Sequence, residues 1–281
     1  MGRVAPARAR PLWCACSGGR SLTTGSVRLR FFGCPLDLVP PAQLLQRAQA
    51  AAEGGERIRI EGLNVAKLVD ARTQGPLRAA LEEAELVHID GSGIGIGLRW
   101  LGAVPPPRRA GIDLMQDLCD QAARSGSGVY LLGARPAVVE AAAARLCAAH
   151  PGLRMAGARD GYFTDAEAPG IVREICTSGA RYLFIGISSP RKELFLQRYW
   201  NELGVALAMG VGGSFDVLSG MLPRAPHWMQ RFGMEWLFRL IQEPRRLAWR
   251  YLRTNAVFLW LLLRARLSRR HRARAIVPCG Q

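Results

Sequence analysis

Long apolar runs, paired cysteines and lysines are all scarce in this 281-residue sequence. The longest apolar run near the C-terminus, residues 256–263, is far shorter than the roughly 20 residues that cross a bilayer, so we expect no transmembrane helix. The N-terminal stretch has no apolar core of the kind that a signal peptide carries. Seven cysteines at scattered positions argue against a disulfide framework and favour a reducing compartment.

Common nucleotide-binding and metal-binding signatures are also missing. The glycines of residues 91–97 do not fit G-x-G-x-x-G, because the sixth position is Ile96, and no G-x-x-x-x-G-K-[ST] occurs. No D-x-D pair is present to hold Mg²⁺, and neither the four histidines nor Cys14 and Cys16 show the spacing of zinc ligands. The sequence therefore predicts no metal and no cofactor.

The chain does have an abundance of arginine, which clusters at its two ends. Lys67 and Lys192 are the only lysines among 38 basic residues, and the formal net charge is +16. Residues 1–30 carry six arginines and no acid, residues 224–281 carry thirteen arginines and two glutamates, and the segment between them has a net charge near −1. High-GC coding explains arginine in place of lysine, but it does not explain this clustering. Basic ends around a neutral middle indicate contact with a polyanionic surface, either nucleic acid or an anionic membrane leaflet.

Between residues 31 and 222, apolar strands alternate with helical segments of 10–15 residues. Strands are expected within RIRIEGLNV, ELVHID, GVYLLG, LRMAGARDGYF, RYLFIGIS and VALAMGVGG. This alternation predicts an α/β fold, a Rossmann-like and mostly parallel sheet with helices on both faces. Residues 1–30 are expected to form a basic, disordered extension. Residues 223–281 are expected to form a helical C-terminal appendage that Pro244 divides into at least two helices.

Polar residues and glycines gather where these strands are expected to end. Ligands of open α/β sheets bind beyond the carboxyl ends of the strands, so residues at these ends should rim one crevice. The candidates are Asn64, Asp90, Gly133, Asp160, Tyr162, Pro190, Lys192, Glu193, Gly212 and Gly213. The GVGG turn offers backbone N–H groups that could cradle a diphosphate, and turn glycines with a purely structural role are the rival interpretation.

Two interpretations of Asp90 remain open. It follows the apolar run ELVHI, and the glycines after it look like a ligand-binding turn. Its carboxylate could act as a general base toward an attacking hydroxyl, or it could cap the turn through backbone N–H groups. His88 shares the face of Asp90, although a lone histidine on a strand is more often structural. A departing diphosphate would need fixed cations in place of a metal, and Arg108 is the candidate within the core.

The appendage combines tryptophan with arginine. Trp228, Trp236, Trp249 and Trp260 lie among arginines on amphipathic helical segments. This pattern is typical of a membrane interface, and packing of the tryptophans on the core is the alternative.

Eight segments together resemble the WecG/TagA/CpsF family of bacterial glycosyltransferases. They are GLNVAKLVDAR, HIDGSGIG, RRAGIDLM, VYLLGARP, DGYF, SSPRKE, GVGGSFD and RAPHWMQRFGMEWLFRLIQEPRR, and the resemblance covers residues 31–255. It implies an inverting, metal-independent enzyme that moves a sugar from a UDP-sugar to a polyprenyl-diphosphate-linked acceptor in cell-surface or exopolysaccharide synthesis. It also implies a peripheral protein at the cytoplasmic face of the plasma membrane, with an anionic membrane surface rather than nucleic acid as its partner. A homo-oligomer is possible.

The resemblance also implies roles for individual residues. By position, Asp90 matches the family's proposed base, Arg108 matches an arginine before a G-x-D segment, and Asn64 matches the asparagine of the first motif. Four arginines of the appendage are candidates for diphosphate contacts: Arg224, Arg231, Arg245 and Arg246.

The chain departs from the family's usual pattern at two positions. Gly62 stands where threonine is usual, and Lys192 stands where glutamine is usual. A cation in place of an amide changes what a sugar pocket can recognise, so Lys192 could pair with a uronate, with a phosphate or simply with Glu193. A glucose or uronic acid donor is therefore as plausible as N-acetylmannosamine.

Two alternatives to an active transferase stay open, a homologue that binds a nucleotide sugar without turnover and an arginine-rich nucleic-acid-binding protein. No helix-turn-helix, RRM or KH pattern supports the second.

Overall fold

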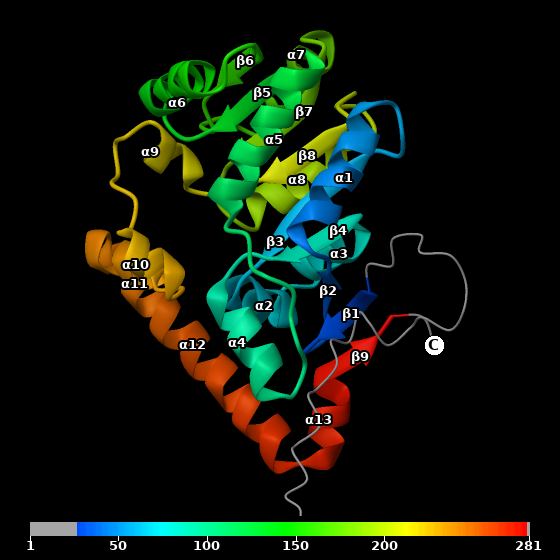
Figure 1. The fold of residues 1–281 in the computed structure, drawn as a ribbon, viewed down its shortest axis with the longest axis vertical. Helices are drawn as coiled ribbons and strands as arrows, with labels where there is room; N and C mark the ends of the chain where they lie inside the picture. The colour runs from blue at the N-terminus through cyan, green and yellow to red at the C-terminus, as the bar shows by residue number, and fades with distance from the viewer. Residues whose placement is uncertain (1–26, 280–281) are drawn as a thin grey trace, which may run out of the picture.

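A parallel β-sheet forms the centre of the computed structural model, which describes residues 27–279 (Figure 1). Its six strands lie in the order β4-β3-β8-β7-β5-β6, and every neighbouring pair is parallel. The strands are β3 (Ile58–Leu63), β4 (Leu86–Ile89), β5 (Gly128–Gly133), β6 (Arg154–Arg159), β7 (Ala180–Gly186) and β8 (Leu207–Gly210). Five strands fall within the apolar segments predicted for them, and β7 begins one residue before its segment, so the predicted Rossmann-like α/β sheet is confirmed.

Helices cover both faces of this sheet. The core on one face holds apolar residues of α1 (Pro41–Ala52), α5 (Gly111–Ser125) and α6 (Pro136–Ala149). On the other face, α7 (Ala168–Thr177) and α8 (Arg191–Tyr199) pack over β5, β7 and β8. Beside β3 and β4, that second face packs against α2 (Val65–Thr73), α3 (Gly75–Glu83) and α4 (Ser92–Trp100). Burial on both faces explains why the central strands read as continuous apolar runs.

The glycines after Asp90 do not form the turn that the sequence indicated. Helix α4 begins at Ser92, directly after Asp90 and Gly91, and contains Gly93, Gly95 and Gly97. A Cβ atom at Gly97 would lie 2.7 Å from the Phe258 ring, and one at Gly93 would lie 2.6 Å from Val65 Cγ2. These glycines therefore allow neighbouring helices to approach α4 closely, which outweighs their low helix propensity.

A small second sheet joins the two ends of the described chain. It is antiparallel, in the order β2-β1-β9, and consists of β1 (Val27–Phe31), β2 (Cys34–Leu38) and β9 (Ile276–Pro278). The expected basic extension, residues 1–30, lies outside the described residues as far as residue 26, and residues 27–30 form most of β1. The sheet packs beside β4, where buried Asp37 accepts a hydrogen bond from the Val87 N–H, 2.7 Å away. This contact satisfies a backbone donor on the outermost strand.

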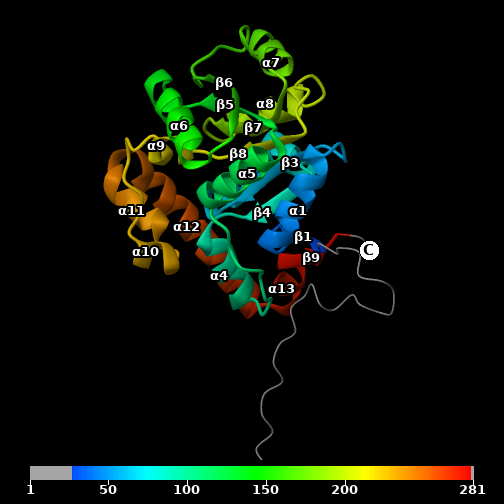
Figure 2. The same cartoon turned by 45° about the horizontal axis from the view of Figure 1, so that its top comes forward.

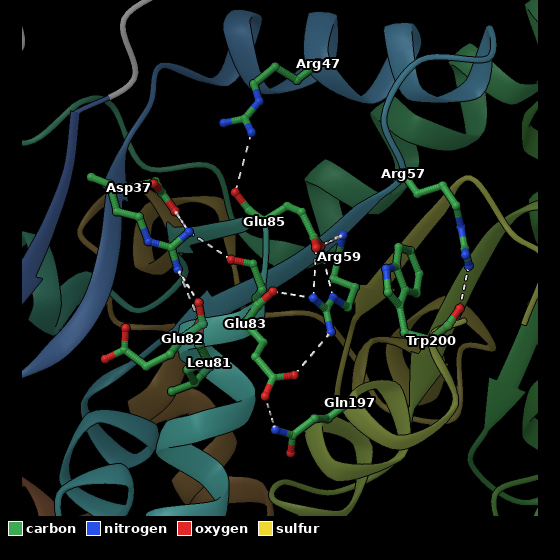
Figure 3. Close-up of polar contacts among 12 residues, drawn as sticks. Asp37, Arg47, Arg57, Arg59, Leu81, Glu82, Glu83, Glu85, Gln197 and Trp200 are labelled. Carbon is green, nitrogen blue, oxygen red and sulfur yellow. Dashed lines mark hydrogen bonds and ion pairs between the residues drawn. The ribbon is translucent and has the colours of Figure 1, made fainter. Parts of the chain in front are cut away.

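At the amino end of the sheet, arginine side chains connect neighbouring segments to β3 (Figure 3). Arg59 on β3 donates to both carboxylate oxygens of Glu85, at 2.8 and 3.0 Å, and also to the Glu83 carbonyl. The Arg57 guanidinium lies 4.2 Å from the centroid of the Trp200 ring and donates to the Trp200 carbonyl. The turn from α3 into β4 and the end of α8 are thereby held to β3. The opposite, carboxyl edge of the sheet remains available for ligands.

The C-terminal region is helical, as expected, and one long helix dominates it. After α9 (Ser214–Leu218) come α10 (His227–Arg231), α11 (Glu235–Gln242), α12 (Pro244–Leu267) and α13 (Arg269–Ala275). Pro244 is the first residue of α12, so the predicted break at this proline is confirmed. Helix α12 runs along α2 and α4 toward β9 and buries Phe258, Leu261 and Leu262 in their shared core (Figure 2). Among residues 27–279, no helix has the length and apolar character needed to cross a membrane.

We expect Phe258→Ala to detach α12 from the core. The ring is 6% exposed and lies between Gly97 and Phe31, so its removal should lower the free energy of unfolding by about 3–5 kcal/mol in urea titrations. The adjacent Leu259 is 52% exposed, and Leu259→Ala should change stability by less than about 1 kcal/mol. Equal losses in the two variants would contradict this packing arrangement.

Candidate active site

The carboxyl ends of all six parallel strands lie at one edge of the sheet, together with the loops that follow them. The connection after β3 leads to β4 on one side, whereas the chain after β8 leads to α9, which packs against α6 on the other side. Connections that leave in opposite directions open a crevice between two strands, and this is where ligands of open α/β sheets bind. Asp90, after β4, and the GVGG turn, after β8, flank β3 on either side. Two strand spacings place these strand ends about 10 Å apart.

Asp90 is held in a fixed position at this edge. Its Oδ1 atom accepts a hydrogen bond from the Gly111 N–H, at the start of α5, over 3.1 Å. A Cβ atom at Gly62 would lie 2.7 Å from Asp90 Cβ and 3.3 Å from His88 Nε2. The absence of a side chain at Gly62 therefore makes room for both groups. The half-buried Asp90 carboxylate has one oxygen engaged by the backbone and lies beside a histidine.

His88 and Asp90 modify each other's protonation. Burial lowers the pKa of His88, so its imidazole is neutral at neutral pH, despite the nearby Asp90 carboxylate, which favours the charged form. Burial alone would raise the pKa of Asp90, but His88, Arg108, Lys67 and the Gly111 N–H together lower it below its ordinary value of 3.8. Asp90 is therefore an ionised carboxylate that can accept a proton.

Two ion pairs and a hydrogen bond connect the appendage to the backbone of Asp90. Arg108 donates to the Asp90 carbonyl oxygen through Nε and lies 2.5 Å from Glu235 Oε2, at the start of α11. Arg224 lies 2.8 Å from Asp113 on α5 and 3.8 Å from Glu235. Two of the predicted arginines thus meet at one glutamate. They connect the segment before α10 and the first turn of α11 to the edge that carries Asp90.

A neutral hydrogen bond reinforces the same junction. Ser92 Oγ, in the first turn of α4, donates to the Gly233 carbonyl over 2.6 Å. Gly233 has φ +69°, and a Cβ atom there would lie 2.6 Å from Ser92 Cβ, so the turn between α10 and α11 rests directly on α4. The appendage therefore borders the crevice next to Asp90.

The turn after β8 leaves backbone donors for a ligand. Its own hydrogen bonds come from the N–H groups of Val211 and Ser214. Within residues 27–279, the N–H groups of Gly212 and Gly213 have no backbone acceptor, and Gly212 has φ +54°. The Arg239 guanidinium lies 3.7 Å from the position of a Cβ atom at Gly213. Two amides and a guanidinium can together hold a phosphate oxygen.

Both lysines of the sequence lie in one buried ring of charges beneath this edge. Lys67 Nζ is 2.9 Å from Glu61 Oε2 and 2.9 Å from Glu193 Oε1, and Lys192 Nζ is 2.6 and 2.7 Å from the same two atoms. All four residues are at most 5% exposed. The second oxygens of both carboxylates have no hydrogen-bond partner among the described residues, so the four charges depend on one another. Of the open alternatives for Lys192, the structure shows pairing with Glu193, and also with Glu61.

The close pairing of opposite charges in the ring favours the charged forms of Glu193 and Lys67. Burial raises the pKa of Glu193, but Lys67 and Lys192 outweigh this effect and hold it well below its ordinary value. Burial lowers the pKa of Lys67, but Glu193 and Glu61 outweigh it and hold this pKa well above its ordinary value. Glu193 and Lys67 are therefore both charged at physiological pH.

The other predicted site residues take several positions. Asn64 caps α2, where its side-chain oxygen accepts the Lys67 N–H at 2.9 Å. Gly133 ends β5 with φ +145° against the Gly186 backbone. Asp160 accepts the Tyr162 N–H at 2.8 Å, and the Tyr162 ring is 74% exposed. Pro190, Arg231, Arg245 and Arg246 are exposed, and Arg246 pairs with Glu243, 2.5 Å away.

Sequence reasoning missed several residues of the site. Glu61, Lys67, Ser92, Glu235 and Arg239 all contact predicted residues or border the same turns. Lys67 could have been recognised from the sequence, because it is one of only two lysines in a chain rich in arginine. Glu235 and Arg239 could not, since their contacts join segments far apart in the sequence.

The all-parallel α/β sheet carries a carboxylate, arginines and a glycine turn at its carboxyl edge, which is where open α/β proteins bind their ligands. Within residues 27–279, no three His, Cys, Asp or Glu side chains gather so that they could hold a metal ion. The chain belongs to the glycosyl transferase WecG/TagA/CpsF family, whose model matches residues 29–272. The protein is thus a glycosyltransferase of cell-surface polysaccharide synthesis, and the resemblance noted from its motifs is confirmed.

We expect Lys192→Met to destabilise the protein severely, because it leaves a buried ring with two carboxylates and one cation. Removing one partner of a buried pair costs about 3–5 kcal/mol, measurable as a loss of unfolding free energy in urea. The double variant Lys192→Met/Glu193→Gln restores neutrality and should recover part of the loss. Arg159→Met, which breaks an exposed pair with Glu174, should cost less than about 1 kcal/mol. Equal stability of the single and double variants would argue against coupling within the ring.

The ring also predicts a pH dependence. Glu193 has a lowered pKa in the folded state, so its contribution is complete above the ordinary value of 4.5 and is lost as pH falls through the folded value. Lys67 has a raised pKa, so its contribution is complete below 10.5 and is lost as pH rises through the folded value. The gap in unfolding free energy between wild type and Lys192→Met/Glu193→Gln should be flat from about pH 5 to 10 and narrow below pH 4.5. A gap that widened in acid would contradict this assignment.

Proposed function

We propose that the protein is an inverting glycosyltransferase that moves a sugar from a UDP-sugar to a polyprenyl-diphosphate-linked acceptor without a metal. The main support for this proposal is the environment of Asp90. It is an ionised carboxylate at the carboxyl edge of the sheet, with one oxygen fixed by Gly111 and with Arg108 beside it. This arrangement suits a general base that takes the proton of an attacking hydroxyl.

In the proposed reaction, the acceptor hydroxyl gives its proton to Asp90 as its oxygen attacks the anomeric carbon of the donor sugar. The bond from that carbon to the diphosphate breaks on the opposite face, which inverts the configuration, and UDP leaves with the electron pair. The N–H groups of Gly212 and Gly213 and the Arg239 guanidinium bind the departing diphosphate. The separation of about 10 Å between the two strand ends matches a sugar and a diphosphate lying end to end across β3.

The C-terminal helices support a peripheral position on the cytoplasmic membrane. On α12, exposed apolar side chains recur at helical spacing on the side opposite the buried core, at Trp249, Leu252, Leu259, Trp260, Leu263 and Leu267. We call these six residues the apolar stripe. Arginines flank it, including Arg245, Arg246 and Arg253, all exposed. An apolar stripe between cations fits an anionic lipid surface and would bring the crevice to a lipid-linked acceptor.

The decisive experiment compares wild type with Asp90→Asn for UDP release from a panel of UDP-sugars. Membranes containing lipid-diphosphate sugars supply the acceptor. Asparagine keeps an acceptor for the Gly111 N–H but cannot take a proton, so kcat should fall by about 10²–10⁴ while UDP binding is retained. The wild-type activity profile would also identify the donor.

Asp120→Asn is the matched control, since Asp120 lies in the half of α5 remote from Gly111 and its carboxylate is 2.6 Å from His150 Nδ1. This control should keep wild-type turnover. Equal turnover of Asp90→Asn and wild type would refute Asp90 as the base. Binding of UDP without release from any donor in the presence of acceptor membranes would favour a homologue that does not turn over.

A further inference from the structure

A second cavity lies away from the crevice, where the turn between β1 and β2 meets α12 and α13. Its volume is about 420 Å³, within the range of small-molecule sites. Its side chains come from α2, α3, α12 and α13, and those that matter here are Arg72, Arg78, Trp260, Arg264, His271 and Arg274. We call it the arginine cavity. Four guanidinium groups and one imidazole face it, and no acid of the described residues lines it.

The arginines of this cavity are only partly neutralised. Arg72 donates to the Phe32 carbonyl at 2.9 Å, and Arg78 lies 4.0 Å from Glu82, a contact at the limit of an ion pair. Glu82 also pairs with Arg30. Arg264 stacks on the Trp260 ring, with its guanidinium carbon 5.1 Å from the ring centroid. Positive charge therefore exceeds negative charge around the cavity.

The pKa of His271 is lowered in this surrounding. Desolvation first, and then the guanidinium groups of Arg264, Arg274 and Arg270, lower the pKa of His271. Its Nδ1 atom lies 3.0 Å from Ser268 Oγ. The lowered pKa agrees with the geometry, because like charges that converge without an anion disfavour a further proton.

The arginine cavity is distinct from the crevice. Helix α2 begins at the carboxyl edge, where Asn64 caps it, and its last residues, including Arg72, reach the cavity. Nine residues of helix span about 13 Å, which separates the two sites. The cavity also adjoins the apolar stripe, since Trp260 belongs to both. In Figure 1, this region lies where the far end of α12 meets α13 and β9.

We propose that the arginine cavity is a binding site for a phosphate group, separate from the site of sugar transfer. Converging guanidinium groups favour oxyanions with several acceptor oxygens, and arginine binds phosphate in bidentate fashion. The phosphate belongs either to an anionic lipid headgroup or to a soluble molecule, and the apolar stripe beside the cavity favours the headgroup. Such a contact would anchor the far end of α12, about 36 Å from its start.

The test uses the full chain and two double variants of equal charge. Arg264→Gln/Arg274→Gln removes two cations of the cavity, neither of which donates a hydrogen bond to the described residues. Arg250→Gln/Arg266→Gln removes two cations of α12 that do not line it. Calorimetric titration with inorganic phosphate measures the site directly. Sedimentation with phosphatidylcholine vesicles, with and without phosphatidylglycerol, measures the headgroup.

We expect the cavity variant to bind inorganic phosphate at least about tenfold more weakly than wild type, with the control variant unchanged. Loss of binding to phosphatidylglycerol vesicles in the cavity variant alone would identify the source as a headgroup. Loss of phosphate binding with unchanged vesicle binding would identify a soluble ligand. Equal behaviour of the two double variants in both assays, or no phosphate binding by wild type, would overturn the proposal.

Arg78→Gln is a second, independent variant, since Arg78 is half exposed and makes only the weak contact with Glu82. It should also weaken phosphate binding while thermal melts stay close to wild type. The proposal does not depend on sugar transfer. An inactive Asp90→Asn protein should keep the phosphate site, so failure of the proposed function would leave this test intact.

Discussion

Four alternating charges beneath the carboxyl edge constrain the rest of the site. Lys67, Lys192, Glu61 and Glu193 join α2 and α8 to β3, and with them the loops that end in Asn64 and Pro190. Lys192 passes so close to β8 that a Cβ atom at Gly210 would collide with its ammonium group. A compact ammonium on a thin stem fits between two carboxylates here, whereas a planar guanidinium is broader. The narrow space between the two carboxylates explains why these two positions hold lysine in a chain that otherwise uses arginine.

The appendage is attached in two different ways. At the far end, α12 is held by Phe258, Leu261 and Leu262, which are buried in a shared core. At the crevice, α11 buries no residue fully and is held by the Arg108–Glu235 pair and by the adjoining Ser92–Gly233 hydrogen bond. Partly exposed polar contacts contribute little free energy individually. The segment beside Asp90 should therefore open at lower free-energy cost than the long helix α12 that follows it.

Much of the fold could be predicted from the sequence, because each central strand is short, apolar and followed by polar or glycine residues. The common edge of Asn64, Asp90 and Gly212 follows from parallel strands alone. The ring around Lys192 could not be predicted, since its members come from positions 61, 67, 192 and 193 and only packing brings them together. The glycines of α4 were misleading, because glycine signals both turns and close helix packing, and only the position of Phe258 distinguishes the two. The hydrogen bond from the Gly111 N–H to Asp90 could not be predicted either, because 21 positions separate the two residues in the sequence.

The pairing of β9 with β1 has a consequence for biosynthesis. Strand β1 leaves the ribosome well before its partner β9, because the whole α/β core lies between them in the sequence. Until β9 arrives, β1 and β2 form a two-stranded hairpin, which is marginal in water without further support. Helix α12, which carries the apolar stripe, is translated after the core and is followed by α13 and β9. The apolar stripe is thus exposed only when the α/β core already exists, which shortens the time during which a growing chain could aggregate through it.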